Sequence, residues 1–262
     1  MVALSSTARA AAPAEELDAL FRDYWEATLR RSPTFATELG DHRYDDRLED
    51  LSEAAHAERI AEVQGFLKRL KAIPAEQLSD RDALNREIFE RTLQDTLAAV
   101  PTHPEWTPLN HLHAPHLSLP LLQVSHPFKS EKDVQNYAVR LRGFGKQVDD
   151  CIACLKAGIE HKHVLPKIVV NKTIPQIRSQ IVTRAEDSEL YRPLTKLPDA
   201  ISEEKKTALR ALVAEAILRN AVPAYERLAK FVEQEYLPAS REDVGIWAVP
   251  NGDELYNIAV RL

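Results

Sequence analysis

The sequence has little glycine, and it lacks long apolar runs. Only 7 of its 262 residues are glycine, and neither G-x-G-x-x-G nor G-x-x-x-x-G-K occurs, which excludes glycine-rich phosphate loops. A mainly β fold is disfavoured, because hairpins and bulges use glycine. No apolar run approaches the roughly 18 residues that a membrane span needs. Since 44% of the residues are hydrophobic, the composition predicts a folded, all-α protein.

Positive charge is also scarce relative to negative charge. The chain has 34 Lys and Arg against 40 Asp and Glu, which gives a net charge of −6. Binding to a polyanion works by replacing counterions with Lys and Arg, so this balance disfavours nucleic acid as a partner.

Cysteine occurs twice, as Cys151 and Cys154 in a C-x-x-C. This spacing is found in redox and zinc sites. Here the pair lies inside a long helical pattern, and no second C-x-x-C completes a four-ligand site. We therefore interpret both as small helix residues without chemistry.

Helical periodicity is the dominant pattern that is present. It predicts a multi-helix array with long antiparallel helices, and the main segments are 14–31, 33–40, 53–72, 80–100, 130–160, 202–236, a less clear one from about 172, and one that begins near 251. Pro223 must kink or split the helix over 202–236. Gly143 and Gly145, inside the helix over 130–160, indicate close packing or a kink.

Residues 101–129 interrupt this pattern. They hold six of the sixteen prolines and five of the nine histidines. We expect an irregular, extended Pro/His-rich segment with one helical turn near 118–125.

The two ends of the chain carry separate expectations. Residues 1–13 are either a disordered lead-in or the remnant of a secretory signal over 1–12, so periplasmic, secreted and cytoplasmic locations stay open. The helix near the C-terminus has no capping residue. We therefore expect 14–262 to form a single helical domain that is the N-terminal part of a larger domain; the family resemblance given below implies that this larger domain is catalytic.

A histidine cluster is the sharpest metal candidate. His111, His113 and His116 lie within six residues and could hold zinc or copper. However, Pro115 breaks a regular helix here, and the H-E-x-x-H spacing is absent. We favour a surface or packing role, and no complete catalytic constellation can be identified in the chain.

Several motifs, taken in order, resemble one bacterial family. They are Phe-Arg-Asp-Tyr-Trp (21–25), Ser-Pro-Thr-Phe-Ala-Thr-Glu-Leu-Gly-Asp-His-Arg-Tyr-Asp-Asp-Arg-Leu (32–48), Asn-Tyr-Ala-Val-Arg-Leu (136–141), Pro-Ala-Tyr-Glu-Arg-Leu (223–228), Glu-Tyr-Leu-Pro-Ala-Ser-Arg (235–241) and Pro-Asn-Gly-Asp-Glu-Leu-Tyr (250–256). From about residue 15 to 262 the chain resembles the bacterial "domain of unknown function" family DUF885.

The resemblance implies a helical zinc metallopeptidase of the gluzincin type, about twice as long as this chain. Its metal helix carries H-E-x-x-H in the C-terminal half, where two His bind zinc and the Glu activates water. The resemblance stops before that helix, so it assigns no metal ligand and no catalytic base to this chain. Zinc is implied only for a full-length relative, with the C-terminal half and a peptide-like substrate as partners.

The resemblance also marks individual residues. Gly40, His42, Tyr44 and Asp45 match the family's N-terminal loop motif, and Gly252 matches a Pro-x-Gly-x-x-x-Tyr element. Arg140 and Tyr256 are candidates for contacting a peptide terminus or carbonyl, unless these residues only hold helices and loops in register.

We therefore expect the N-terminal wall of a peptidase cleft, inactive alone. The alternative is a stand-alone helical binding or scaffold module.

Overall fold

The computed structural model of the protein describes residues 12–112 and 114–261. Over these ranges the regular structure is helical, with one isolated β-bridge between Pro166 and Arg241, so the all-α class is confirmed. The α-helices are α1 (Pro13–Arg31), α2 (Pro33–Glu38), α3 (Glu53–Lys71), α4 (Asp80–Ala98), α5 (Pro115–Ser125), α6 (Glu131–Glu160), α7 (Lys167–Arg178), α8 (Glu203–Ala216), α9 (Val222–Phe231), α10 (Leu237–Ala239) and α11 (Gly252–Arg261). In the described part, no helix is long and apolar enough to cross a membrane.

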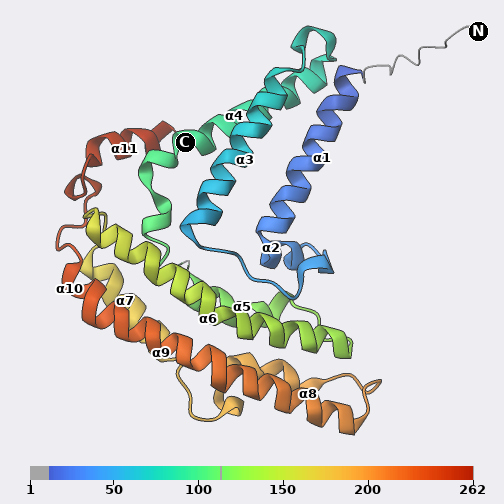
Figure 1. The fold of residues 1–262 in the computed structure, drawn as a ribbon, viewed down its shortest axis with the longest axis vertical. Coiled ribbons are helices and arrows are strands. Elements are labelled where there is room, and N and C mark those ends of the chain that lie inside the picture. Colours follow the sequence, from blue (N-terminus) through green and yellow to red (C-terminus); the bar gives the residue numbers. More distant parts are fainter. Residues whose placement is uncertain (1–11, 113, 262) are drawn as a thin grey trace, which may run out of the picture.

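The first three long helices, α1, α3 and α4, pack as an antiparallel bundle (Figure 1). Asp23 pairs with Arg69 at 2.6 Å, while Arg31, further along α1, pairs with Glu62, which lies earlier on α3. Edge-to-face rings join the helices inside, with Phe89 5.2 Å from Phe21. These contacts enclose a small core of their own, in which the prediction of antiparallel helices is confirmed.

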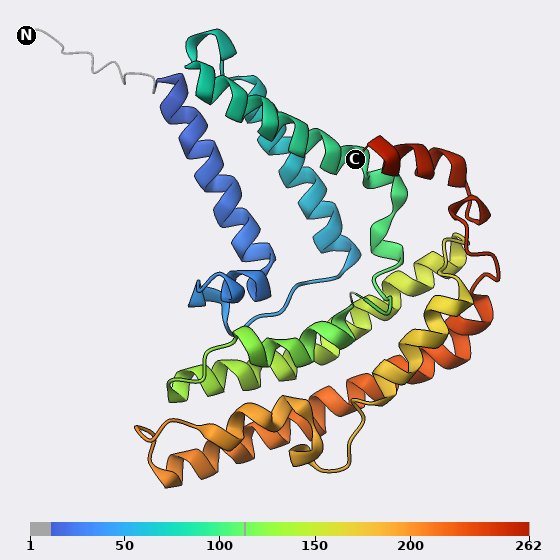
Figure 2. The same cartoon turned by 180° about the vertical axis from the view of Figure 1, so that it is seen from behind.

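The larger core lies between α6 and the long helical run α8–α10. Three ion pairs set the direction of this packing, namely Glu131–Lys205 at 2.6 Å, Asp149–Arg227 at 3.1 Å and Lys156–Glu235 at 3.8 Å. Residue numbers rise together on both sides, so the two longest elements run parallel (Figure 2). The expectation of antiparallel helices is wrong here, because 161–202, including α7, returns the chain to the starting end.

Prolines shape the α8–α10 run without ending it. Two π-helical turns, η7 (Ile217–Ala221) and η8 (Val232–Tyr236), interrupt it. In each case the residue just before a proline donates its N–H to the carbonyl five residues back, Val222 to Ile217 and Leu237 to Val232. The wider turn makes room for the rings of Pro223 and Pro238, which would clash in a regular α-helix. The kink or split predicted at Pro223 is therefore a local widening.

Residues 101–129 are more regular than predicted. Two short 3-10 turns, η3 (Val100–Thr102) and η4 (Pro104–Trp106), precede the eleven-residue helix α5. Pro115 occupies the first position of α5, where its missing N–H costs no hydrogen bond. The less clear helix that was expected from about 172 is α7, and it begins five residues earlier, at Lys167.

At the N-terminal end, α1 begins at Pro13, with Ala12 preceding it. The rest of the predicted lead-in or signal remnant lies outside the described residues. The single domain over 14–262 stays a prediction.

Candidate functional site

The loop that carries the family motif connects α2 to α3. Gly40 adopts a φ of +84°, a left-handed conformation that glycine enters without strain, and the turn η1 (His42–Tyr44) follows. Arg43 of this turn binds Glu26 of α1 at 2.8 Å. The loop is thus fastened to the three-helix bundle on one side.

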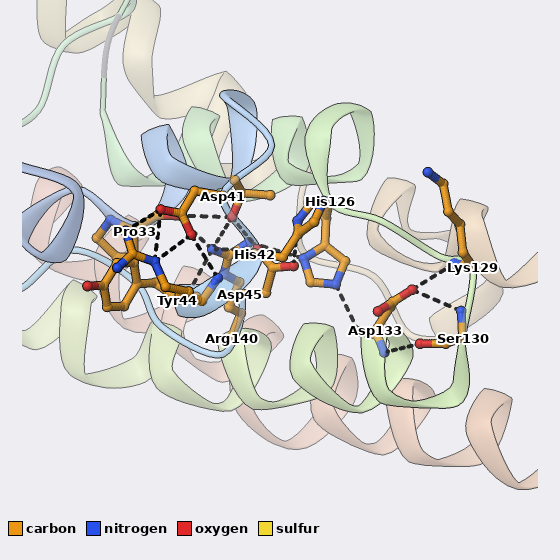
Figure 3. Close-up of polar contacts among 12 residues, drawn as sticks. Pro33, Asp41, His42, Tyr44, Asp45, His126, Lys129, Ser130, Asp133 and Arg140 are labelled. Atoms are coloured by element: carbon orange, nitrogen blue, oxygen red, sulfur yellow. Dashed lines mark hydrogen bonds and ion pairs between the residues drawn. The ribbon is translucent and has the colours of Figure 1, made fainter. Parts of the chain in front are cut away.

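On its other side the loop receives Arg140 of α6, which is fully buried (Figure 3). Its Nε donates to the Arg47 carbonyl oxygen at 2.8 Å, and its Nη2 lies within 3.1 Å of the carbonyl oxygens of Pro33 and Tyr44. Nη2 also lies 2.6 Å from the Thr37 hydroxyl oxygen. The guanidinium therefore holds both α2 and the motif loop against α6.

Asp45 supplies the counter-charge. Its Oδ1 accepts a hydrogen bond from Thr37 Oγ1 at 2.6 Å and lies 3.9 Å from Arg140 Nη2, while Oδ2 lies 3.0 Å from Nδ1 of the half-exposed His42. Burial lowers the pKa of Arg140, and the charge of Asp45 opposes this effect. Both side chains of the pair are buried, so it is suited to holding the loop on α6.

The carbonyl contacts continue along α6 at a spacing of seven residues. Arg140 binds the carbonyl of Arg47, Gln147 Nε2 donates to that of Glu49 at 3.0 Å, and Cys154 Sγ donates to that of Leu51 at 3.3 Å. Alternate carbonyls of the extended segment 47–51 thus face one stripe of the helix. The sequence analysis missed the roles of Gln147 and Cys154, although the seven-residue spacing of hydrogen-bond donors was visible.

A cleft of about 740 Å³ opens where this segment meets the bundle. Its walls are the C-terminal half of α1, the N-terminal half of α3, residues 48–52 and the region of η4. Charged side chains line much of it, among them Arg30, Arg31, Arg59 and Glu62. Its volume lies within the roughly 300–1,000 Å³ that is usual for ligand pockets.

A histidine–tryptophan stack involves η4, whose Pro104 and Glu105 line the cleft. The ring of Trp106 lies between His103 and His161, at centroid distances of 3.6 and 4.3 Å and nearly parallel to both. Glu105 lines the cleft beside it, with Oε1 2.8 Å from His103 Nδ1 and Oε2 3.2 Å from His56 Nε2. Periodicity gave no sign of this cluster, because its residues come from α3, η4 and the end of α6.

Tyr256 belongs to α11, and this helix lies away from α2 and the loop that follows it (Figure 1). Its side chain is 58% exposed, which leaves it accessible to a partner. The glycine of the same element has a structural role, because a Cβ on Gly252 would lie 2.2 Å from the Ile246 carbonyl oxygen. Arg140 and Tyr256, the two candidate substrate contacts, are therefore not brought together, and for Arg140 the contacts support the register-holding alternative.

The three-histidine metal hypothesis is tested only in part, since His113 lies outside the described residues. His116 is buried, with Nε2 3.3 Å from Gln176 Oε1, and burial lowers its pKa to about 4. His111 lies beside it, where its carbonyl accepts from Gln176 Nε2 at 3.2 Å. Over 12–112 and 114–261, no three His, Cys, Asp or Glu side chains are grouped to hold a metal ion.

Fold and site together define an all-α protein in which a buried arginine fastens a three-helix bundle to a helical layer. The chain belongs to the family described as "Bacterial protein of unknown function (DUF885)", whose model matches residues 33–262. No curated protein matches the chain.

Solved structures share the fold, and one of them illustrates the likeness. It is described as "the putative lipoprotein from Colwellia psychrerythraea", and it superposes with a TM-score of 0.82 at 20% sequence identity. The match covers 96% of this chain and 46% of that chain, so this chain spans about half the length of its structural relative.

Proposed function

We propose that this chain forms the N-terminal helical wall of the substrate cleft in a zinc-metallopeptidase-like hydrolase, and that it is inactive alone. The observation that carries the proposal is the cleft between α1, α3 and residues 48–52. The half-length match to a longer chain of the same fold supports it. In this proposal the segment 47–51, docked on α6 by Arg140, Gln147 and Cys154, forms the floor on which a peptide lies.

Zinc does not fit the residues described here, because none of their His, Cys, Asp and Glu side chains form a group of three suited to a metal. No catalytic step is therefore assigned to this chain. In the proposal, zinc and the general base belong to the remainder of a longer protein, and this chain binds and orients the substrate.

The coding DNA beyond the codon for Leu262 provides the first test. The proposal expects an H-E-x-x-H motif within the next few hundred codons. A stop codon directly after Leu262 would contradict it and would favour the stand-alone binding or scaffold module.

A peptidase assay provides the second test. We expect no hydrolysis of fluorogenic peptides by this chain, with or without added zinc, and chelator-sensitive hydrolysis by a longer protein that contains it. Zinc-dependent hydrolysis by the chain alone would overturn the proposal.

A further inference from the structure

One arginine of the cleft is left without a partner by the described residues. Arg30 and Arg31 both bind Glu62, Arg30 at 3.0 Å, so the two oxygens of that carboxylate are in use. Arg59 lines the same cleft on α3, one turn before Glu62, and no described side chain forms an ion pair or hydrogen bond with it. All the N–H groups of its guanidinium are therefore free to bind a ligand.

The acidic residues of the lining do not neutralise Arg59, because most of them bind elsewhere. Asp50 lies 3.3 Å from Lys146, Glu49 accepts from the Thr34 amide at 3.0 Å, and Glu105 lies against His56 and His103. Each of these carboxylates therefore has a partner other than Arg59.

Glu58 is the other charged lining residue to which the described side chains offer no partner. It precedes Arg59 on the same helix, and neighbouring helix positions point about 100° apart, so the two side chains do not face each other. The cleft thus keeps one free guanidinium and, apart from it, one free carboxylate.

We propose that Arg59 binds the C-terminal carboxylate of a short peptide in this cleft. The planar guanidinium matches a carboxylate through two parallel N–H···O bonds, a geometry that an ammonium group does not offer. The choice of a peptide rests on the proposed function, whereas the choice of a carboxylate rests on Arg59. Because the site is open to solvent, added salt weakens this contact.

The test compares Ala-Ala-Ala with its C-terminal amide, which removes the negative charge and changes little else. Both are titrated into the isotopically labelled chain, and the Kd is obtained from NMR shifts that include the Arg59 Nε–Hε signal. We expect the free acid to bind at least ten-fold more tightly than the amide, with the largest shift at Arg59. The difference should shrink at high salt.

Three variants locate the effect. In Arg59→Gln the two peptides should bind equally, and in Arg59→Lys part of the difference should remain. Arg81→Gln is the matched control, because Arg81 is exposed on α4, outside the cleft, and makes no ion pair with described residues. It should keep the full difference, and the thermal unfolding of all variants is recorded to confirm folding.

Equal binding of the two peptides by the unaltered chain, binding of neither, or an undiminished difference in Arg59→Gln would overturn the inference. These outcomes are distinct from failure of the proposed function, which is read from zinc-dependent hydrolysis by the chain alone. A cleft wall that binds the amide as well as the acid would keep that function and lose only the carboxylate contact.

Discussion

Arg140 Nη1 lies 3.1 Å from His126 Nδ1, which places a guanidinium next to a neutral imidazole. His126 Nε2 lies 2.8 Å from the Asp133 carbonyl oxygen, so Nε2 carries the proton and Nδ1 accepts. Burial lowers the pKa of His126, as does the charge of Arg140. The Nε2-protonated tautomer of His126 therefore links the segment between α5 and α6 to Arg140, which binds the motif loop.

Replacing the buried arginine tests this locking role. Arg140→Met removes the donors to the loop carbonyls and leaves Asp45 buried without its counter-charge, so we expect a loss of about 3–5 kcal/mol in the free energy of unfolding. Urea denaturation measures this value. Arg142→Met is the control, because Arg142 is exposed on the same helix, and its effect should stay within about 0.5 kcal/mol. Similar losses in both variants would contradict the role of Arg140.

Acid should destabilise the protein through its buried histidines. Burial lowers the pKa of His116 from 6.5 to about 4, so the unfolded chain binds a proton more readily than the folded chain between these values. The contribution of neutral His116 to the free energy of unfolding is therefore fully present above about pH 6.5. It is lost as the pH falls towards 4, and this loss lowers the free energy of unfolding by about 3 kcal/mol.

His116→Asn should flatten that dependence, since an amide does not titrate in this range. The measurement is the free energy of unfolding at intervals from pH 7 to pH 4. Some slope should remain, because burial also lowers the pKa of His126 and of His163. An unchanged slope in the variant would show that His116 is not the source.

The helix boundaries could be predicted because their causes are local. The helices predicted over 53–72, 80–100, 130–160 and 202–236 each start at a serine, namely Ser52, Ser79, Ser130 and Ser202. Each serine side chain accepts a backbone N–H from three residues ahead, which is a signal within a few residues of the chain. The direction of packing could not be predicted in this way. An apolar stripe has no direction, so nothing in the periodicity distinguished parallel from antiparallel packing of α6 with α8–α10.

The candidate site was less visible for a similar reason. Arginine is seldom fully buried, and the resemblance left Arg140 open between a substrate contact and a role in holding helices and loops in register. Its burial depends on carbonyl groups of residues 33–47, which lie about a hundred positions earlier in the chain. The sequence delimited the loop that carries Gly40, His42, Tyr44 and Asp45, but the docking of this loop on α6 could be seen only in the fold.

The two cysteines should be chemically silent in the folded protein. Burial raises the pKa of Cys154 to about 11 and raises that of Cys151 further, so neither forms a thiolate at neutral pH. We expect no reaction with a thiol reagent at pH 7.5 before unfolding and two equivalents after it. Rapid labelling of the native protein would revive the redox interpretation of the C-x-x-C pair.

Two glycines of α6 should respond to alanine in opposite directions. A Cβ on Gly158 would lie 2.6 Å from the Trp106 carbonyl oxygen and 2.9 Å from that of His163, and backbone atoms cannot yield easily. We expect Gly158→Ala to lower the free energy of unfolding by about 1–3 kcal/mol. It should also change the near-ultraviolet circular dichroism of Trp106, which is stacked between two histidines.

Gly143→Ala is the matched substitution in the same helix. A Cβ there meets no atom within 4 Å, so of the close packing or kink predicted for Gly143 and Gly145, close packing does not apply at Gly143. Alanine favours the helix over glycine by up to about 1 kcal/mol, so this variant should be more stable than the parent chain. The near-ultraviolet circular dichroism of Trp106 should stay unchanged in Gly143→Ala, because no atom of η4 lies within 4 Å of the added Cβ. If both substitutions destabilised the protein equally, the close approach of Trp106 to α6 would not be the reason that residue 158 is glycine.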